Sequence, residues 1–154
     1  MKIRKAKSHD TMRICDIHRS SVRILARDHY SAQEIEGWVG GLIPASYEEV
    51  VQTRECFVAE KCGEIVGFGQ LKAGSGRIEA VFVAPECSRQ GVGVALLSHL
   101  ESVADAQGIR CLQLSASLNS VEFYKRAGYR EQGRGSHRLL SGKEIACVHM
   151  MKEL

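Results

Sequence analysis

Residues 77–97 constrain the fold of this chain more than any other stretch. The apolar run Arg77–Val83 predicts a buried strand that ends before Pro85, because proline cannot donate to a sheet ladder. A loop containing Gly91 and Gly93 follows and leads directly into an amphipathic helix. The first turn of a helix carries unpaired N–H groups and the positive end of the helix dipole. This strand–loop–helix junction therefore predicts a site for an anion.

The spacing around the two glycines excludes two common nucleotide-binding loops. A Walker loop requires GxxxxGK[ST], but no lysine follows either glycine at that spacing. A dinucleotide fingerprint requires a third glycine or alanine at the position of Leu96. Taken alone, the glycine loop also fits a plain helix entry built from flexible residues.

Two segments of the chain carry a family resemblance. Residues 88–93, SRQGVG, resemble the acyl-CoA loop [RQ]xxGx[GA] of the GNAT superfamily of N-acetyltransferases. Residues 117–129, SLNSVEFYKRAGY, resemble the second GNAT signature, NxxAxxFYxxxG[FY], and follow the first at the expected place in the chain. Three serines depart from these patterns: Ser88 replaces Arg or Gln, Ser117 replaces Asn, and Ser120 replaces Ala.

The resemblance implies that acetyl-CoA is the acyl donor. Its pantetheine would lie along splayed central strands, where a β-bulge exposes the backbone of Val81 and Val83. Its pyrophosphate would sit on the N–H groups of the glycine loop, with Arg89 supplying side-chain charge. The predicted cofactor-binding residues are Val81, Val83, Ser88, Arg89, Gln90, Gly91, Val92, Gly93, Val94 and Asn119.

Two residues are predicted to be catalytic. Glu79 is the only carboxylate in the central strand, and its spacing matches that of the glutamate that is the general base in the histone-acetylating branch of the GNAT superfamily. The alternative is a structural ion pair with Arg77 or another cation. Tyr124 lies in the second signature, and its hydroxyl could hand a proton to the departing thiolate. The alternative is a place in the core beside Phe123.

Composition limits the remaining classes of function. A net charge of +3 and a pI near 8.6 are too mild to indicate nucleic-acid binding, although they suit a small anion such as CoA. The apolar runs are too short to span a membrane. Six cysteines without a CxxC pair, and an N-terminus without an apolar leader, predict a reduced, cytoplasmic protein. The histidines show no metal-ligand spacing, so no metal site is expected.

Capping signals predict the helices of the N-terminal third. Ser8 is predicted to cap a first helix, because neighbours such as Ser8, His9 and Asp10 do not face one another as a catalytic triad would. Ser31-x-x-Glu34 and Ser46-x-x-Glu49 predict capping boxes for two more helices. By resemblance these helices line the acceptor side of the cleft, where the candidates are Tyr30, Trp38 and Tyr47, which could equally be packing residues.

Periodicity predicts the remaining elements. The predicted strands are residues 2–7, 56–61, 65–72, 111–115, 129–140 and 143–151, and the predicted later helices end at Gly108 and span 119–127. This order predicts an α/β or α+β fold with one mixed central sheet and helices on both faces, in a single domain over residues 1–154.

The sequence thus predicts an N-acetyltransferase that moves an acetyl group directly from acetyl-CoA to a primary amine. The acceptor stays open among polyamines, aminoglycosides, amino acids and protein N-termini, and so does a homodimer. Two alternatives remain: a regulatory module that binds acyl-CoA without turnover, and transfer of a longer acyl group. The presence of both Glu79 and Tyr124 favours the enzyme.

Overall fold

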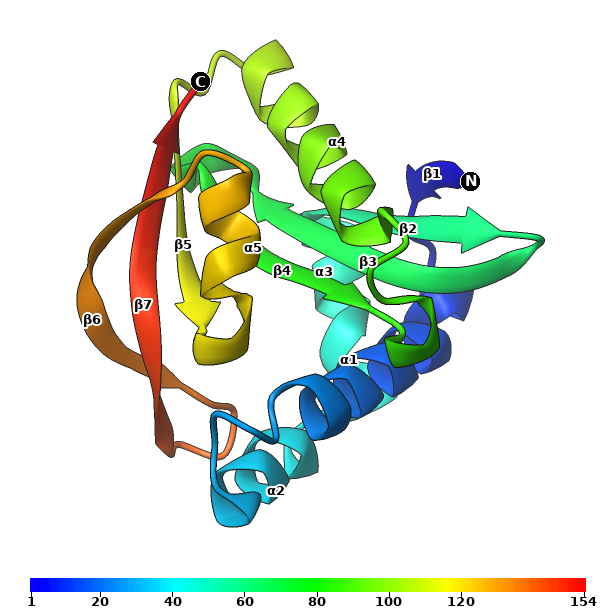
Figure 1. The fold of residues 1–154 in the computed structure, drawn as a ribbon. Helices are drawn as coiled ribbons and strands as arrows, with labels where there is room; N and C mark the ends of the chain where they lie inside the picture. Colours follow the sequence, from blue (N-terminus) through cyan, green and yellow to red (C-terminus); the bar gives the residue numbers. More distant parts are fainter.

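The central strand forms with the predicted bounds, Arg77–Val83, and is labelled β4. A computed structural model describes residues 1–154, except for the side chain of Ala73. Within the described residues, seven strands form one mixed sheet in the order β1-β2-β3-β4-β5-β7-β6 (Figure 1). The strand ends where predicted because Pro85 begins a 3-10 turn directly after it.

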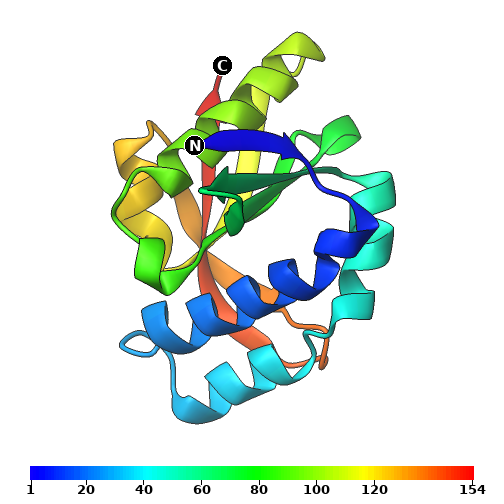
Figure 2. The same ribbon diagram turned by 90° about the vertical axis from the view of Figure 1, so that its right-hand side faces the viewer.

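Helices cover both faces of this sheet, as predicted. The other strands are β1 (Lys2–Lys5), β2 (Glu55–Lys61), β3 (Glu64–Lys72), β5 (Cys111–Ser117), β6 (Arg130–Arg138) and β7 (Glu144–Glu153). The helices are α1 (Thr11–Leu25), α2 (Ala32–Gly40), α3 (Glu48–Thr53), α4 (Val92–Ala106) and α5 (Val121–Arg126). Figure 2 shows α4 on one face of the sheet and α1 and α2 on the other. Strand β5 is two residues longer than expected, and the last predicted helix begins as a 3-10 turn, Leu118–Ser120.

Two glycines in β3 allow α4 to lie close against the sheet. A Cβ at Gly67 would stand 3.0 Å from Leu96 Cδ1 and from Val92 Cγ1. A Cβ at Gly69 would stand 3.1 Å from Leu100 Cδ1. Larger residues at these positions would push the helix outward, so the two glycines let α4 lie close to β3.

One of the three predicted caps is present. Glu34 N–H donates to Ser31 Oγ at 3.0 Å and Ser31 N–H donates to Glu34 Oε1 at 2.9 Å, which confirms the first capping box. The second box is wrong, because Pro44 starts a 3-10 turn, Pro44–Tyr47, that contains Ser46. Ser8 is not a cap either, because it lies inside another 3-10 turn, Ser8–Asp10.

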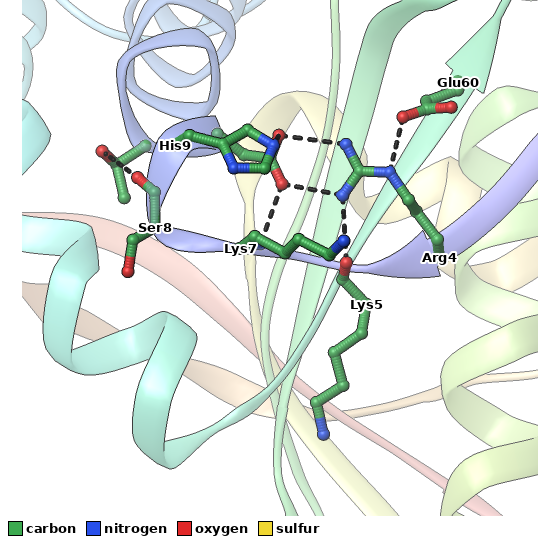
Figure 3. Close-up of polar contacts among 8 residues, drawn as sticks. Arg4, Lys5, Lys7, Ser8, His9 and Glu60 are labelled. Atoms are coloured by element: carbon green, nitrogen blue, oxygen red, sulfur yellow. Dashed lines mark hydrogen bonds and ion pairs between the residues drawn. The ribbon is translucent and has the colours of Figure 1, made fainter.

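Asp10 takes the place of Ser8 at the start of α1. Its carboxylate is 3% exposed and accepts from Lys7 N–H at 2.8 Å. Arg4 on β1 donates to both carboxylate oxygens, at 2.8 and 3.0 Å, and its Nε also donates to Glu60 on β2. Figure 3 shows the Arg4 guanidinium bonded to Glu60 on one side and pointing toward the turn of Lys7, Ser8 and His9 on the other. This cluster joins the edge of the sheet to the first helix.

The Arg4 cluster predicts a dependence of stability on acid pH. The hydrogen bonds from Arg4 lower the pKa of Asp10 in the folded protein. Their contribution to stability is therefore present above the unfolded pKa of about 3.9 and is lost as the pH falls through the lower, folded pKa. We expect Arg4→Met to lower the free energy of unfolding at pH 7 by about 3 kcal/mol, because it leaves a buried carboxylate without its cation. Urea unfolding of the wild type and of Arg4→Met from pH 7 to pH 2.5 measures the difference between their free energies of unfolding.

The matched control is Lys5→Met, which removes a neighbouring cation that pairs with Glu55 at the surface. That change should cost less than about 1 kcal/mol. Equal losses from the two variants would show that the Arg4 cluster contributes no more than a surface ion pair.

Candidate active site

The site begins where β4 and β5 separate. These parallel strands are in register only at Arg77 and Gln113, and they diverge from that point (Figure 1). Along the rest of β4, the backbone edge turned away from β3 therefore has no neighbouring strand among the described residues. An unpaired strand edge presents N–H and C=O groups that another extended molecule can bind.

An irregularity in β4 lies close to this separation. Ile78 is opposite Leu71 and Ala80 is opposite Gln70, so Glu79 is the extra residue of a β-bulge. The prediction put the bulge at Val81 and Val83, but these residues are in regular register with Gly69 and Gly67. The bulge is thus two residues earlier, and it turns Glu79 out of the ladder.

The separation opens into a cleft of about 1060 Å³ lined by α1, β4, β5, α5 and the start of α4. Eight of the ten predicted cofactor-binding residues line it: Val81, Val83, Ser88, Arg89, Gly91, Gly93, Val94 and Asn119. The side chains of the other two lie elsewhere. Gln90 accepts from Lys61 Nζ at 2.9 Å, and Val92 is 2% exposed in the core. Only the backbone of these two residues is placed to contribute to the loop.

The glycine loop has the backbone of an anion site. Arg89 and Gly91 both have positive φ, 59° and 84°, and α4 starts at the next residue. The N–H groups of its first turn have no helical acceptor, so they are free to bind an anion. A left-handed backbone conformation raises the free energy of a non-glycine residue such as Arg89. Non-glycine residues in this conformation cluster at functional sites.

Gly93 brings the two sequence signatures into contact. A Cβ at this position would stand 3.2 Å from Phe123 Cε1 and 3.3 Å from Phe123 Cζ. These distances are at the limit of real Cβ contacts, so the start of α4 and the start of α5 approach each other closely only because residue 93 has no side chain.

Glu79 lies in the cleft within an ion pair. Arg54 Nε, at the end of α3, donates to Glu79 Oε1 at 2.9 Å, and the Glu79 side chain is 26% exposed. Arg77 is not the partner, because its Nη2 donates to Ser115 Oγ at 2.6 Å. The cation pairing considered from the sequence is thus present through Arg54, and it leaves the carboxylate accessible from the cleft.

Tyr124 lies on α5 and lines the same cleft. The residue is buried, its ring packs edge-on against Phe123 and Tyr129, and burial raises the pKa of its hydroxyl. The hydroxyl has no hydrogen-bond partner within the described part of the chain. A phenol that stays protonated and is not bonded to the protein is available to donate a proton.

Asn119 provides an orphaned polar atom in the cleft. Its Oδ1 is buried and lacks a hydrogen-bond partner among the described residues. Buried acceptors are normally satisfied, so this one indicates a ligand with a donor group. Nearby, the two serines that depart from the second signature, Ser117 and Ser120, bond to each other at 3.0 Å between their Oγ atoms.

The three residues that were candidates to line the acceptor side of the cleft do not all lie there. Tyr30 and Trp38 line the cleft. Tyr30 also holds the fold together, because its hydroxyl donates to Ala146 O at 2.6 Å and accepts from Leu118 N–H at 2.9 Å. Tyr47 is a buried core residue whose hydroxyl bonds to His18 Nδ1 at 2.6 Å.

Sequence reasoning missed several residues that line the cleft, including His18, Ser21, His137 and Cys147. The signal for His18 was present, because it lies four residues after Ile14 and four before Val22 on the apolar face of α1. A polar residue on such a face is a candidate for a site. No comparable signal marks His137 or Cys147, which reach the cleft through the pairing of β6 with β7.

Two further findings concern metal ligands and membrane-spanning helices. Over the part of the chain that the structure describes, no group of three or more His, Cys, Asp or Glu side chains is arranged to hold a metal ion. Within the same residues, none of the helices has the length and apolar character that crossing a bilayer requires.

Comparison with known proteins gives a consistent result. A family model described as an acetyltransferase (GNAT) domain matches residues 26–154. An uncharacterised N-acetyltransferase of Escherichia coli, YafP, is 28% identical over 130 residues, which is 84% of this chain and 81% of that protein.

Two solved structures extend the comparison. The crystal structure of a GCN5-related N-acetyltransferase from Rhodopseudomonas palustris superposes with a TM-score of 0.93 and 28% identity, covering 99% of this chain and 95% of that one. The PaiA N-acetyltransferase of Thermoplasma acidophilum, solved in complex with coenzyme A, has a TM-score of 0.78 and 20% identity over 99% of this chain and 98% of its own.

Proposed function

Because the chain belongs to the GNAT acetyltransferase family, we propose that it transfers an acetyl group from acetyl-CoA directly to a primary amine, with Glu79 as general base and Tyr124 as general acid. The observation that carries this proposal is the cleft between β4 and β5, which both side chains line together with the glycine loop. We also propose that residues 1–154 act as one domain. In support, β1 completes the sheet, and α1 supplies one wall of the cleft.

Residues of the cleft fit the donor. The free N–H groups of the loop and the cations of Arg89 and Arg126 suit its phosphates, and neither arginine has an ion-pair partner among the described residues. The orphaned Asn119 Oδ1 suits an N–H or O–H donor of the same molecule. When bound, acetyl-CoA supplies an acetyl group activated as a thioester.

The proposed proton transfers use the two sides of the cleft. Glu79, directly or through a water molecule, takes a proton from the acceptor ammonium, so that the neutral amine can attack the carbonyl carbon. The new C–N bond forms as the C–S bond breaks, and the nitrogen releases its second proton to solvent. Tyr124 gives its proton to the leaving sulfur and is reprotonated from solvent. The ion pair with Arg54 orients the Glu79 carboxylate.

We further propose that this chemistry takes place in the reducing cytoplasm. All six cysteines carry free thiols in the structure, which supports this compartment.

The loop can be tested with two glycines at opposite ends of α4. Gly91→Val and Gly108→Val place a branched side chain at positive φ, 84° and 77°, with no other atom within 4 Å of either Cβ. Both should cost about 1–2 kcal/mol of stability. Only Gly91→Val should abolish the rise in melting temperature that acetyl-CoA causes. At 100 times its Kd, a ligand adds about 2.7 kcal/mol to the free energy of unfolding. A retained shift in the folded Gly91→Val variant would place the phosphate site elsewhere.

Glu79→Gln removes the proposed base and keeps its shape. We expect kcat/KM to fall by roughly 10²–10⁴, and the decline of the rate toward acid pH to flatten or move, because the carboxylate that is protonated there is gone. Acetyl-CoA affinity should be almost unchanged. The control is Glu122→Gln, which removes another carboxylate that lines the cleft and pairs with Lys125. If Glu79→Gln leaves the pH–rate profile unaltered, Glu79 serves only its ion pair with Arg54.

Tyr124→Phe removes the proposed acid without opening a cavity. We expect kcat to fall about 10- to 1,000-fold, while stability hardly changes, because the hydroxyl has no protein partner to lose. Tyr129→Phe is the control, since its hydroxyl donates to Glu101 Oε1 at 3.1 Å and does not line the cleft. That variant should lose about 1 kcal/mol of stability and keep its kcat. The opposite pattern in the two variants would move the general acid to another group.

A further inference from the structure

The part of the cleft between α1, α2 and β4 has an apolar wall. We define this wall as Val22, Leu25, Ala26, Trp38, Phe82 and Ile145, all of which line the cleft. The acceptor amine must approach Glu79, which directly precedes Ala80 and lies three residues before Phe82 on the same strand. The body of the acceptor therefore lies against this wall when its nitrogen is near the carboxylate.

Aromatic rings within the wall and beside it form a continuous set. The rings of His18 and Phe82 are 4.1 Å apart between centroids, at 33°. Trp38 lies edge-on to His18 at 6.5 Å and edge-on to Tyr30 at 5.8 Å. Such a set of rings favours a flat apolar ligand, because offset-stacked and edge-to-face contacts add to the free energy of burial.

His18 places an aromatic ring without a positive charge beside this wall. Burial lowers its pKa to about 3, so the imidazole is neutral at physiological pH. The hydrogen bond between its Nδ1 and the Tyr47 hydroxyl holds the ring in place. The His18 ring is therefore held beside the wall and is uncharged.

Carboxylates are scarce in the cleft. Of the residues that line it, only Glu79 and Glu122 carry one. Glu79 pairs with Arg54 at 2.9 Å, and Glu122 pairs with Lys125 at 3.6 Å on α5. A second ammonium group on the acceptor would find no free carboxylate within the described lining, and leaving a cation unpaired against an apolar wall is costly.

Building on the proposed function, we propose that the acceptor is a primary monoamine with an apolar, aromatic body, and that polycations such as polyamines and aminoglycosides are rejected. The wall supplies contacts for the ring, Glu79 serves the one ammonium group, and the described lining holds no unpaired carboxylate for another. This excludes polyamines and aminoglycosides, two of the acceptor classes that the sequence left open, and names a class that the sequence did not suggest.

Measuring the release of CoA with amines of different classes tests this assignment of the acceptor. We expect kcat/KM for 2-phenylethylamine to exceed that for spermidine and for kanamycin by about 100-fold. Equal or higher values for either polycation would overturn the inference and leave the proposed function standing. Absence of CoA release with every amine, from a protein that acetyl-CoA stabilises, would overturn the proposed function itself and this inference with it.

A charge placed on the wall gives the sharper test. Leu25→Glu adds a carboxylate at the rim of the cleft, where Leu25 is 37% exposed. It should raise the ratio of spermidine to 2-phenylethylamine activity at least about 10-fold, because it supplies the missing partner of the second ammonium group. The matched control, Ile24→Glu, adds the same charge one residue earlier, at a position that is 45% exposed and outside the cleft. An unchanged ratio in Leu25→Glu, or the same rise in both variants, would contradict the inference.

Trp38 allows acceptor binding to be measured without turnover. It is the only tryptophan of the chain, and it belongs to the apolar wall. With CoA present, 2-phenylethylamine should change the intrinsic fluorescence of the wild type in a saturable way, and spermidine at the same concentration should not. A saturable change with spermidine, or none with 2-phenylethylamine, would show that the wall does not select the acceptor.

Discussion

The loss of pairing between β4 and β5 is the constraint on which the site depends. Two parallel strands that stayed in register beyond Arg77 and Gln113 would close the sheet and leave no room between them. Because they separate, the edge of β4 that is turned away from β3 has no strand partner beyond Arg77 among the described residues, and the bulge at Glu79 lines the cleft. The helices on both faces stabilise the two halves of the sheet, since the halves have little direct hydrogen bonding to each other.

Much of the fold was predictable because its signals are local. Pro85 ends β4, the turn at Cys62 and Gly63 joins β2 to β3, and Ser31 with Glu34 starts α2. The two caps that failed depended on competition among residues that the sequence does not rank. Arg4 makes Asp10 the buried partner at the start of α1, and Pro44 turns the backbone before Ser46 could act as a cap.

The candidate site was predictable where a motif carried it and not where contacts cross the chain. The glycine loop and Tyr124 follow from their signatures. The ion pair of Glu79 joins residues 25 positions apart, and the bond between His18 and Tyr47 joins residues 29 apart, so neither leaves a local pattern. The bulge was misplaced for a similar reason, because its position is set by the register of β4 against β3. The apolar wall brings together residues of α1, α2, β4 and β7 that have no shared sequence signal.

The contact between Gly93 and Phe123 has a consequence for how sequences of this kind can diverge. These residues belong to two signatures 30 positions apart, yet a single methyl group added to the first would touch the ring of the second. A lineage that replaced Gly93 with alanine would need a smaller or displaced side chain at position 123 in the same step or soon after. The two signatures are therefore expected to covary at this pair of positions, and a loop grafted from a relative would have to be transferred together with the first turn of α5.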